Sequence, residues 1–260
     1  MTPRSAEAAG WQPRWRELVK GVVRVHSPRG EEQLLDWLVR PGEPRILAFV
    51  NAHAMNAAAL SSEFFDSLVA ADLLLRDGIG MAILLRLLNQ APGLNLNGTD
   101  LIPKILARCE GKTVALFGTQ DPYLSQARAA IERRVPGVRC VAAHGFLDTV
   151  RYVRLAVAHR PAVIVLGMGM PRQEEVAVAL RAAIGFACLI VCGGAIIDFL
   201  GNKTSRAPAW LRRSGLEWMY RLALEPRRLF RRYVLGNPVF LARALRLAAQ
   251  SMRQEHGAAA

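Results

Sequence analysis

Short apolar runs followed by polar turns that contain glycine recur along this chain. The run at 162–166 is Ala-Val-Ile-Val-Leu, and similar runs at 71–75, 114–117 and 188–191 lead into turns of the same kind. Such runs are typical of strands buried on both faces, and helix-like sequence follows the turns. The pattern predicts an α/β fold with an open, mainly parallel sheet of Rossmann-like strand-loop-helix units. Ligands of such sheets bind at the carboxyl ends of the strands.

The turn at 167–174, Gly-Met-Gly-Met-Pro-Arg-Gln-Glu, is the most informative of these segments. Gly167 and Gly169 let the backbone approach a ligand closely, and Pro171 suits the first turn of a helix. The unpaired N–H groups and the positive dipole of that helix would face an anion. We therefore expect a phosphate group to bind here, with Gly118 in a comparable turn after the run at 114–117.

Composition allows one sizeable core, since the chain has 260 residues of which 52% are hydrophobic. We expect an α/β domain over 1–200 and a helical appendage over 201–260. The first 30 residues lack the apolar core of a secretory signal, and we expect buried thiols at Cys188 and Cys192, which together favour a reducing cytoplasm. The longest charge-free apolar run, 182–197, is too short and too rich in glycine to favour a membrane span.

Positive charge is concentrated in the appendage, where twelve lysines and arginines stand against three acidic residues. A helix from Pro226 to Gly236 would be amphipathic, and Pro238 would start another. The cationic face of the first helix would hold Arg227, Arg228, Arg231 and Arg232, and its apolar face would hold Leu229, Phe230, Tyr233 and Val234. An anionic membrane surface or a lipid diphosphate suits such a helix. Alternatively, the apolar face packs on the domain or in a homo-oligomer, and the arginines are merely solvated.

Seven ordered motifs, collinear over about residues 45–240, resemble the WecG/TagA/CpsF-type glycosyltransferases. They are Phe-Val-Asn-Ala-His at 49–53, Asp-Gly-Ile-Gly within 71–80, Asn-Gly-Thr-Asp-Leu at 97–101, the turn at 167–174, Asp-Phe-Leu-Gly-Asn-Lys at 198–203, Arg-Ala-Pro at 206–208, and Gly-Leu-Glu-Trp-Met-Tyr-Arg at 215–221 with Glu-Pro-Arg-Arg at 225–228. The resemblance implies a bacterial enzyme that moves a sugar, with inversion, from a UDP-sugar to a polyprenyl (undecaprenyl) diphosphate-linked saccharide. It would act at the cytoplasmic face of the cell membrane, in cell-surface or exopolysaccharide synthesis.

Glycosyl transfer needs a base, and Asp77 follows an apolar run that would aim its carboxylate into the ligand crevice. Capping the helix that starts near Ile79 is the alternative role of this residue. The resemblance adds Gln173 as a second active-site residue, whose amide can donate and accept at once. Arg172 and Glu174 could form a surface pair at the helix start instead.

The remaining donor-site candidates each have a structural alternative. Asn51 could cap a helix, Gly98, Thr99 and Asp100 could start one, and Asp198 could be a satisfied turn carboxylate. The full donor set is Asn51, Gly98, Thr99, Asp100, Gly118, Gly167, Gly169, Pro171, Arg172, Gln173 and Asp198. The acceptor and membrane set is Arg206, Arg221, Arg227, Arg228, Arg231 and Arg232.

Neither a metal nor another cofactor is expected, because the chain contains no Asp-x-Asp pair. Helix N-termini and arginines would stabilise the leaving group. Two positions depart from the family pattern: Phe49 stands where a hydroxyl residue is common, and Asn95 stands near a frequent arginine. No nucleic acid partner is expected, since the basic stretch contains no recognisable reading motif. A non-catalytic nucleotide- or nucleic-acid-binding module with a basic tail is the rival interpretation.

Overall fold

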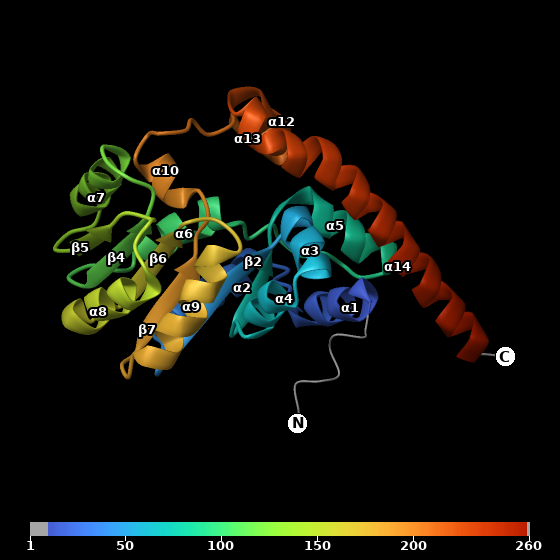
Figure 1. Ribbon diagram of the computed structural model, residues 1–260, viewed down its shortest axis with the longest axis horizontal. Coiled ribbons are helices and arrows are strands. Elements are labelled where there is room, and N and C mark those ends of the chain that lie inside the picture. Colours follow the sequence, from blue (N-terminus) through green and yellow to red (C-terminus); the bar gives the residue numbers. More distant parts are fainter. Residues whose placement is uncertain (1–9, 259–260) are drawn as a thin grey trace.

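Seven parallel strands form a single sheet in the computed structural model, which describes residues 10–258 (Figure 1). The strand order is β1-β3-β2-β7-β6-β4-β5, so the sheet is open and every pairing in it is parallel. The strands are β1 (Val22–Val23), β2 (Pro44–Val50), β3 (Leu73–Arg76), β4 (Thr113–Gly118), β5 (Arg139–Ala143), β6 (Val163–Gly167) and β7 (Cys188–Cys192). The predicted α/β fold is confirmed.

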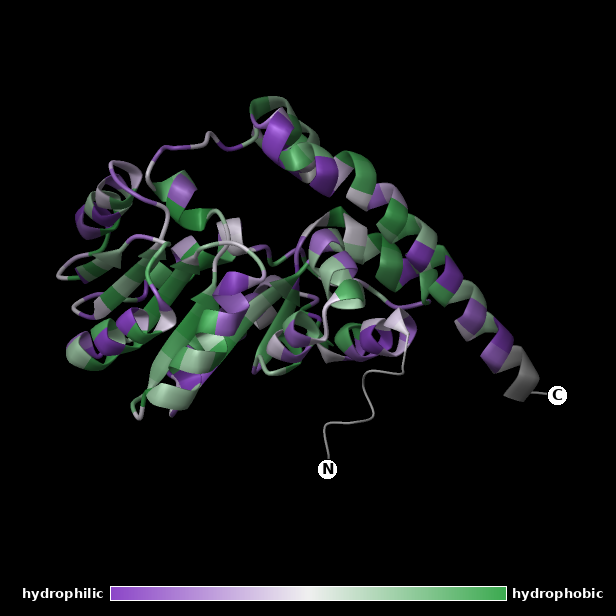
Figure 2. Ribbon diagram, viewed as in Figure 1, coloured by the Kyte–Doolittle hydropathy of each residue, from purple (hydrophilic) through white to green (hydrophobic). Residues whose placement is uncertain are grey.

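Alternate residues of each strand enter two separate cores, because successive side chains point to opposite faces of the sheet. Ile46 and Ala48 of β2 belong to one core, and Leu47 and Phe49 belong to the other. Helices cover both faces, which explains why the strands are apolar throughout and do not alternate with polar residues (Figure 2).

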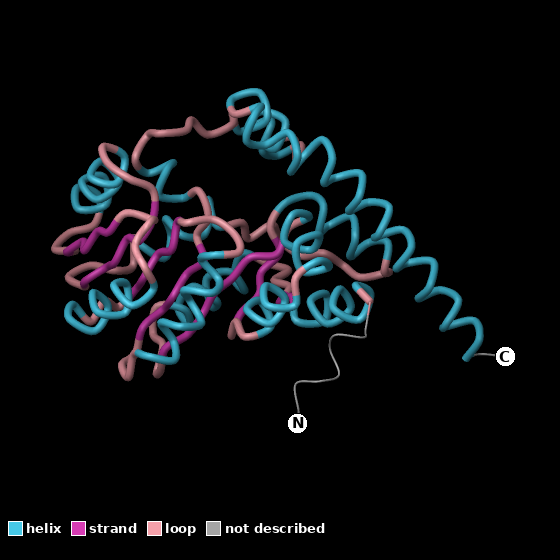
Figure 3. The backbone as a smooth tube through the Cα atoms, in the orientation of Figure 1, coloured by secondary structure: helices cyan, strands magenta, loops and turns pink. Residues whose placement is uncertain are grey.

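The helices divide between these two cores. Those of the first core are α1 (Trp11–Gly21), α3 (Ala52–Leu60), α4 (Ser62–Val69), α5 (Gly78–Leu87), α8 (Thr149–His159), α9 (Arg172–Ala183) and α14 (Gly236–Ala258). Those of the second core are α2 (Pro28–Leu38), α6 (Gly98–Leu106), α7 (Tyr123–Arg134) and α10 (Ile196–Leu200). All the loops that leave the carboxyl ends of the strands lie along one edge of this sandwich (Figure 3).

Cys188 and Cys192 are both buried in the first core, as the sequence predicts for two residues on one face of a strand. Burial raises the pKa of the Cys188 thiol to about 12 and that of Cys192 well above its usual value. Both side chains therefore behave as small apolar residues.

The segment after the last strand is helical and returns to the core. It comprises α11 (Ala209–Arg213), α12 (Glu217–Leu224), α13 (Pro226–Phe230), the π-helical turn η2 (Arg231–Leu235) and α14. Phe240, Ala244 and Leu247 of α14 are buried in the first core, where the Phe240 ring lies 5.3 Å from the Trp15 ring. The final helix of the appendage is thus part of the main hydrophobic core, against α3 and α5.

The predicted helix end at Gly236 and new start at Pro238 are wrong. Gly236 has helical backbone angles, φ −71° and ψ −38°, and its N–H bonds to the carbonyl of Arg231, five residues back. Pro238 has no N–H to donate, so one hydrogen bond of the helix is missing, and the π-helical turn η2 lies just before it. Burial of Phe240 and the residues after it favours continuation of the helix over the local tendency to stop.

Candidate functional site

Two cavities meet at the carboxyl edge of the sheet, beneath the returning appendage. The first, of about 310 Å³, is lined by turns after β4, β6 and β7 and by polar side chains, and we term it the polar cavity. The second, of about 800 Å³, lies between α3 and α5 on one side and α12, η2 and α14 on the other; we term it the apolar cavity. Residues that line both are Asn51, Asp77, Thr99, Arg221 and Arg232.

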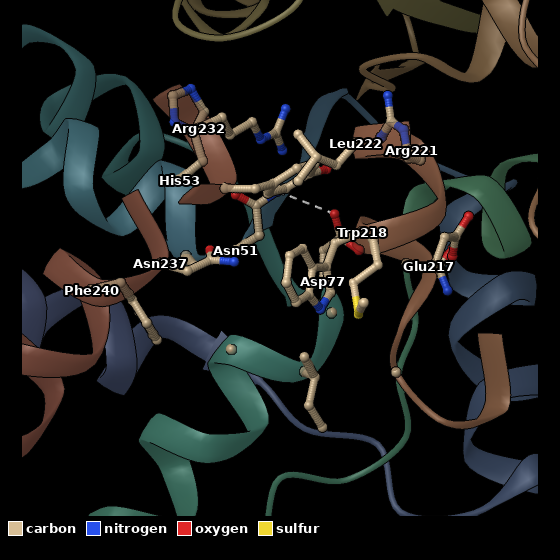
Figure 4. Close-up of a pocket in the computed structure, with 18 of the residues that line it drawn as sticks. Asn51, His53, Asp77, Glu217, Trp218, Arg221, Leu222, Arg232, Asn237 and Phe240 are labelled. Carbon is tan, nitrogen blue, oxygen red and sulfur yellow. Dashed lines mark hydrogen bonds between the residues drawn. The ribbon is translucent and has the colours of Figure 1, made fainter. Parts of the chain in front are cut away.

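Asp77 follows β3 directly and occupies the N-cap position of α5. Within the described part of the chain, the Asp77 side chain accepts no hydrogen bond from a backbone N–H of the helix. Instead, one of its carboxylate oxygens accepts a hydrogen bond of 3.2 Å from Nδ2 of Asn51. Gly78 has φ +81° and open space where a Cβ would lie. The carboxylate therefore remains available at the junction of the cavities (Figure 4).

Asn51 performs the capping role that was its structural alternative and also contacts Asp77. Its Oδ1 accepts from the backbone N–H of Ala54 at 3.0 Å, which fixes the amide at the start of α3. The amide orientation leaves Nδ2 directed to the Asp77 carboxylate. Helix capping and orientation of Asp77 are thus two uses of one side chain.

Arg76 braces the turn that carries Asp77, a role that the sequence analysis did not identify. Its buried guanidinium donates to the carbonyls of Pro92 and Gly93, each at 2.7 Å, and to Oδ1 of Asn95 at 3.3 Å. The same oxygen of Asn95 accepts from the N–H of Gly78 at 2.9 Å. A charged residue at the end of an otherwise apolar strand was the available sequence indication.

Asp198 lies in the polar cavity with two partners that sequence reasoning missed. It accepts a 2.6 Å hydrogen bond from the hydroxyl of Thr119, and the ammonium of Lys203 lies 3.2 Å away. Thr119 follows β4 and Lys203 belongs to the motif at 198–203, so both lie in segments that the sequence indicates as candidates. The carboxylate is satisfied internally, and the Lys203 ammonium adds positive charge to the cavity.

Guanidinium groups from the appendage enter the polar cavity at Arg221, Arg228 and Arg232. The Nε atoms of Arg221 and Arg232 are buried, and no described residue accepts a hydrogen bond from them. Burial lowers the pKa of Arg232, because removal from water disfavours the charged guanidinium. This cluster of donors fits an anion with several oxygens.

The four arginines of the predicted cationic face do not all line the cavities. Arg228 and Arg232 line the polar cavity, although Arg228 is also exposed and its Nε lies 2.5 Å from Oε2 of Glu225. Arg227 and Arg231 are exposed and belong to neither lining. On the predicted apolar face, Leu229 is buried but Phe230 is 50% exposed. The helix lies at the mouth of the cavities, so part of each predicted face points inward and part outward.

Gln173 is 1% exposed and contributes to the polar cavity through the first turn of α9. Its Oε1 accepts from the N–H of Gly194 at 2.9 Å, and its Nε2 donates to Glu174 at 2.8 Å. The alternative of a surface pair between Arg172 and Glu174 is wrong, because Glu174 is also 1% exposed. Arg172 instead donates to the carbonyl of Leu147.

Residues 98–100 have two different roles: two of them line the cavities, and the third makes a structural ion pair. Asn97 caps α6, Gly98 lines the polar cavity and Thr99 lines both cavities. Asp100 instead pairs with Arg206, and Arg212 lies 3.6 Å away. Burial opposes ionisation of Asp100, but hydrogen bonds from Arg206 and Asn97 outweigh it and hold its pKa below the usual value. Asp100 and Arg206, predicted in the donor and acceptor sets, thus tether the appendage to α6.

Only some of the predicted glycines and their neighbours line the polar cavity. Gly167 and Gly169 line the polar cavity, but Pro171 and Arg172 are not in its lining. Gly118 serves the packing of β4 on β6, since a Cβ there would lie 2.5 Å from the carbonyl oxygen of Gly167. Close approach of two strands, as well as of a ligand, requires glycine.

The apolar cavity combines aliphatic and aromatic walls with a few ionisable groups. Its apolar lining includes Ile79, Ile83, Trp218, Met219, Leu222 and Phe240. Burial, with the nearby Arg232, lowers the pKa of His53 to about 4, so its imidazole is neutral at pH 7. Burial raises the pKa of Glu217, which faces the cavity from α12.

Neither cavity contains an evident metal-binding cluster, since no three His, Cys, Asp or Glu side chains within the described residues are grouped to hold an ion. No helix of the described chain is long and apolar enough to cross a membrane.

Comparison with known proteins gives a family match and named relatives. The family model described as glycosyl transferase WecG/TagA/CpsF family matches residues 21–254. An N-acetylglucosaminyldiphosphoundecaprenol N-acetyl-beta-D-mannosaminyltransferase of Bacillus subtilis strain 168 is 29% identical over 185 residues, covering 70% of this chain and 72% of that protein. A protein of the same name from Staphylococcus aureus is 26% identical over 198 residues, with coverages of 74% and 76%.

Proposed function

This chain belongs to the WecG/TagA/CpsF family of glycosyltransferases, and on that premise we propose that it transfers a sugar from a UDP-sugar to a polyprenyl-diphosphate-linked saccharide. The observation that carries the proposal is the position of Asp77, whose carboxylate borders both the polar and the apolar cavity. A base placed between two substrate sites can act on the acceptor while facing the donor. Membership of an enzyme family favours this function over a non-catalytic nucleotide- or nucleic-acid-binding module.

The polar cavity is proposed to bind the donor. The turn at Gly167–Gly169 lines it next to the N-terminus of α9, and Arg221, Arg228 and Arg232 face it from the appendage. Both elements suit the diphosphate of a UDP-sugar. Unpaired N–H groups on two of the guanidinium groups strengthen that assignment, because a bound phosphate oxygen would satisfy them.

Asp77 is proposed as the general base of a single displacement. The acceptor hydroxyl oxygen attacks the anomeric carbon of the donor sugar while its proton passes to the Asp77 carboxylate. The bond from the anomeric carbon to the diphosphate oxygen breaks, and UDP leaves with that electron pair. One displacement inverts the anomeric configuration. Arginines and helix N–H groups stabilise the growing negative charge on the diphosphate, in place of a metal ion.

The apolar cavity and the appendage, 201–260, are proposed to receive the acceptor at a membrane. The named relatives act on an acceptor linked to undecaprenyl diphosphate. Trp218 and Leu222 line this cavity, and Trp210, Phe230 and Leu235 of the same segment are at least half exposed. Exposed apolar side chains together with Arg227 and Arg231 suit an anionic membrane surface. We place the enzyme at the cytoplasmic face of the membrane, in exopolysaccharide or other cell-surface polymer synthesis.

A transfer assay tests the proposed function. The full chain is incubated with single UDP-sugars, including UDP-N-acetylmannosamine, UDP-N-acetylglucosamine and UDP-hexoses, and a short-chain polyprenyl-diphosphate-linked saccharide. The expected result is release of UDP with one sugar added to the lipid, in the opposite anomeric configuration. Lack of UDP binding and of transfer with this panel, alongside tight binding of single-stranded nucleic acid at physiological salt, would contradict it.

A further inference from the structure

Glu174 is a buried carboxylate for which the proposed reaction has no direct use. Its neighbour Gln173 lines the polar cavity, but Glu174 lies behind that lining. Gln173 Nε2 donates to Glu174 Oε1 at 2.8 Å, and Gln173 Oε1 accepts from the N–H of Gly194 at 2.9 Å. Both ends of the Gln173 amide therefore have a protein partner.

The partners of this amide permit only one of its two orientations. Rotation by 180° would set Gln173 Oε1 against the carboxylate oxygen of Glu174 and its NH₂ group against the N–H of Gly194. Both contacts would be repulsive, because an ionised carboxylate only accepts and a backbone N–H only donates. The second N–H and second lone pair of the Gln173 amide are left for a ligand.

The turn that Gln173 holds is itself part of the polar cavity. Gly193, Gly194 and Ala195 follow β7 and line the cavity beside the turn at Gly167–Gly169. Gly194 has φ +59°, in the region that favours glycine. The hydrogen bond from this turn to Gln173 thus joins the segments after β6 and β7, beside a second bond from the N–H of Gly193 to the carbonyl of Leu166.

Burial of a carboxylate at position 174 costs free energy, and the need to fill space there does not explain that cost. Glu174 Oε2 is buried, and no hydrogen-bond partner for it exists among residues 10–258. Burial raises the pKa of Glu174 to about 7, with the charge of Glu175 on the same helix adding to the effect. The Cys192 thiol on β7 also interacts with it electrostatically. An apolar side chain of similar size would fill the site without this cost.

We propose that Glu174 is a positioning residue that acts through the Gln173 amide to hold the turn at Gly193–Gly194 in the shape that receives the diphosphate of the donor. This inference rests on the proposed function for the identity of the ligand. The hydrogen-bonded arrangement itself does not depend on which nucleotide binds.

Three proteins test the proposal: the unchanged chain, Glu174→Gln and the matched control Glu175→Gln. Glu175 lies one residue further along the same helical turn and is exposed. A glutamine at 174 can donate as well as accept, so only the N–H of Gly194 still fixes the orientation of the Gln173 amide. We expect amide hydrogen exchange at Gly194 to accelerate by about tenfold and the dissociation constant for UDP to rise by about tenfold in Glu174→Gln only.

A double-mutant cycle separates positioning from independent effects. Gln173→Ala should weaken UDP binding, and adding Glu174→Gln to that variant should change the dissociation constant no further. Additive effects, or equal effects of Glu175→Gln, would overturn the proposal. Should Glu174→Gln fail to fold, the side-chain amide resonance of Gln173 in the unchanged protein should shift with pH near 7; a constant resonance would overturn it as well. Failure of the unchanged chain to bind UDP would contradict the proposed function instead, while exchange at Gly194 still tests the inference.

Discussion

Nδ2 of Asn51 lies 3.2 Å from a carboxylate oxygen of Asp77, and the two residues directly follow neighbouring strands of the sheet. Asn51 is fixed from its other side by the N–H of Ala54, so its amide orients the Asp77 carboxylate and is not free to rotate. Asp77 in turn leaves the first turn of α5 uncapped by its side chain. The helix forgoes a capping interaction that is commonly worth about 1 kcal/mol, which fits a carboxylate retained for chemistry.

The division of the arginines predicts different outcomes for two double variants. Arg228→Gln with Arg232→Gln removes guanidinium groups from the polar cavity and should weaken binding of the UDP-sugar and slow both its hydrolysis and its transfer. Arg227→Gln with Arg231→Gln removes the same charge from the exposed side. It should leave UDP affinity unchanged and weaken binding to anionic vesicles by about 1 kcal/mol per arginine at low salt. Equal losses of UDP affinity in the two variants, measured by calorimetry, would contradict this division.

Gly118→Ala tests whether that glycine serves strand packing. The new Cβ would lie 2.5 Å from the carbonyl oxygen of Gly167, so β4 and β6 must separate. We expect a loss of roughly 2 kcal/mol or more in the free energy of unfolding, measured with urea. Gly185→Ala is the control, because nothing lies within 4 Å of its Cβ position, and it should change stability by less than about 1 kcal/mol. An unaltered unfolding midpoint in Gly118→Ala would contradict the packing role.

The raised pKa of Glu174 predicts a pH-dependent effect on stability. The carboxyl has a pKa of about 7 in the folded chain and near 4.5 when unfolded. Its favourable contribution is therefore complete below pH 4.5 and is lost as pH rises through 7, when an ionised carboxylate must stay buried. Relative to the unchanged protein, Glu174→Gln should gain up to about 3 kcal/mol between pH 5 and pH 8. Urea unfolding at these pH values measures the difference. Glu175→Gln should show only a small fraction of this gain, because the charge of Glu175 is the smallest of the causes that act on the Glu174 pKa.

Transfer should persist in excess EDTA, because arginines and helix N–H groups are proposed to stabilise the leaving diphosphate. The measurement is the initial rate of transfer before and after removal of divalent ions. Complete inhibition by EDTA that Mg²⁺ or Mn²⁺ reverses would show that a metal ion performs this role.

Strand positions and the edge that carries the ligand site could be predicted because they depend on local pattern. The apolar run at 162–166 and its glycine turn specify a buried strand and a helix N-terminus wherever they pack. Asp77 could be singled out for the same reason, since the carboxyl ends of parallel strands share one edge.

Long-range contacts could not be predicted in this way. Local pattern places a helix stop at Gly236, but burial of Phe240 against Trp15, far away in sequence, decides that the helix continues. A helical wheel groups Arg227 with Arg228, whereas only the docking of the appendage decides which of them faces the cavity. Burial of Glu174 likewise depends on packing across α9 and β7 and has no local indication.

Asp77→Asn tests the general base, because it removes the carboxylate while keeping the size of the side chain and its place beside Asn51. UDP affinity, measured by calorimetry, should stay within about threefold of that of the unchanged chain, while transfer to the lipid-linked acceptor should fall by roughly 10² to 10⁴, the usual contribution of a positioned general base. Thermal unfolding close to that of the unchanged chain would confirm that the variant is folded. Transfer at a near-normal rate by folded Asp77→Asn would contradict the assignment of Asp77 as the base.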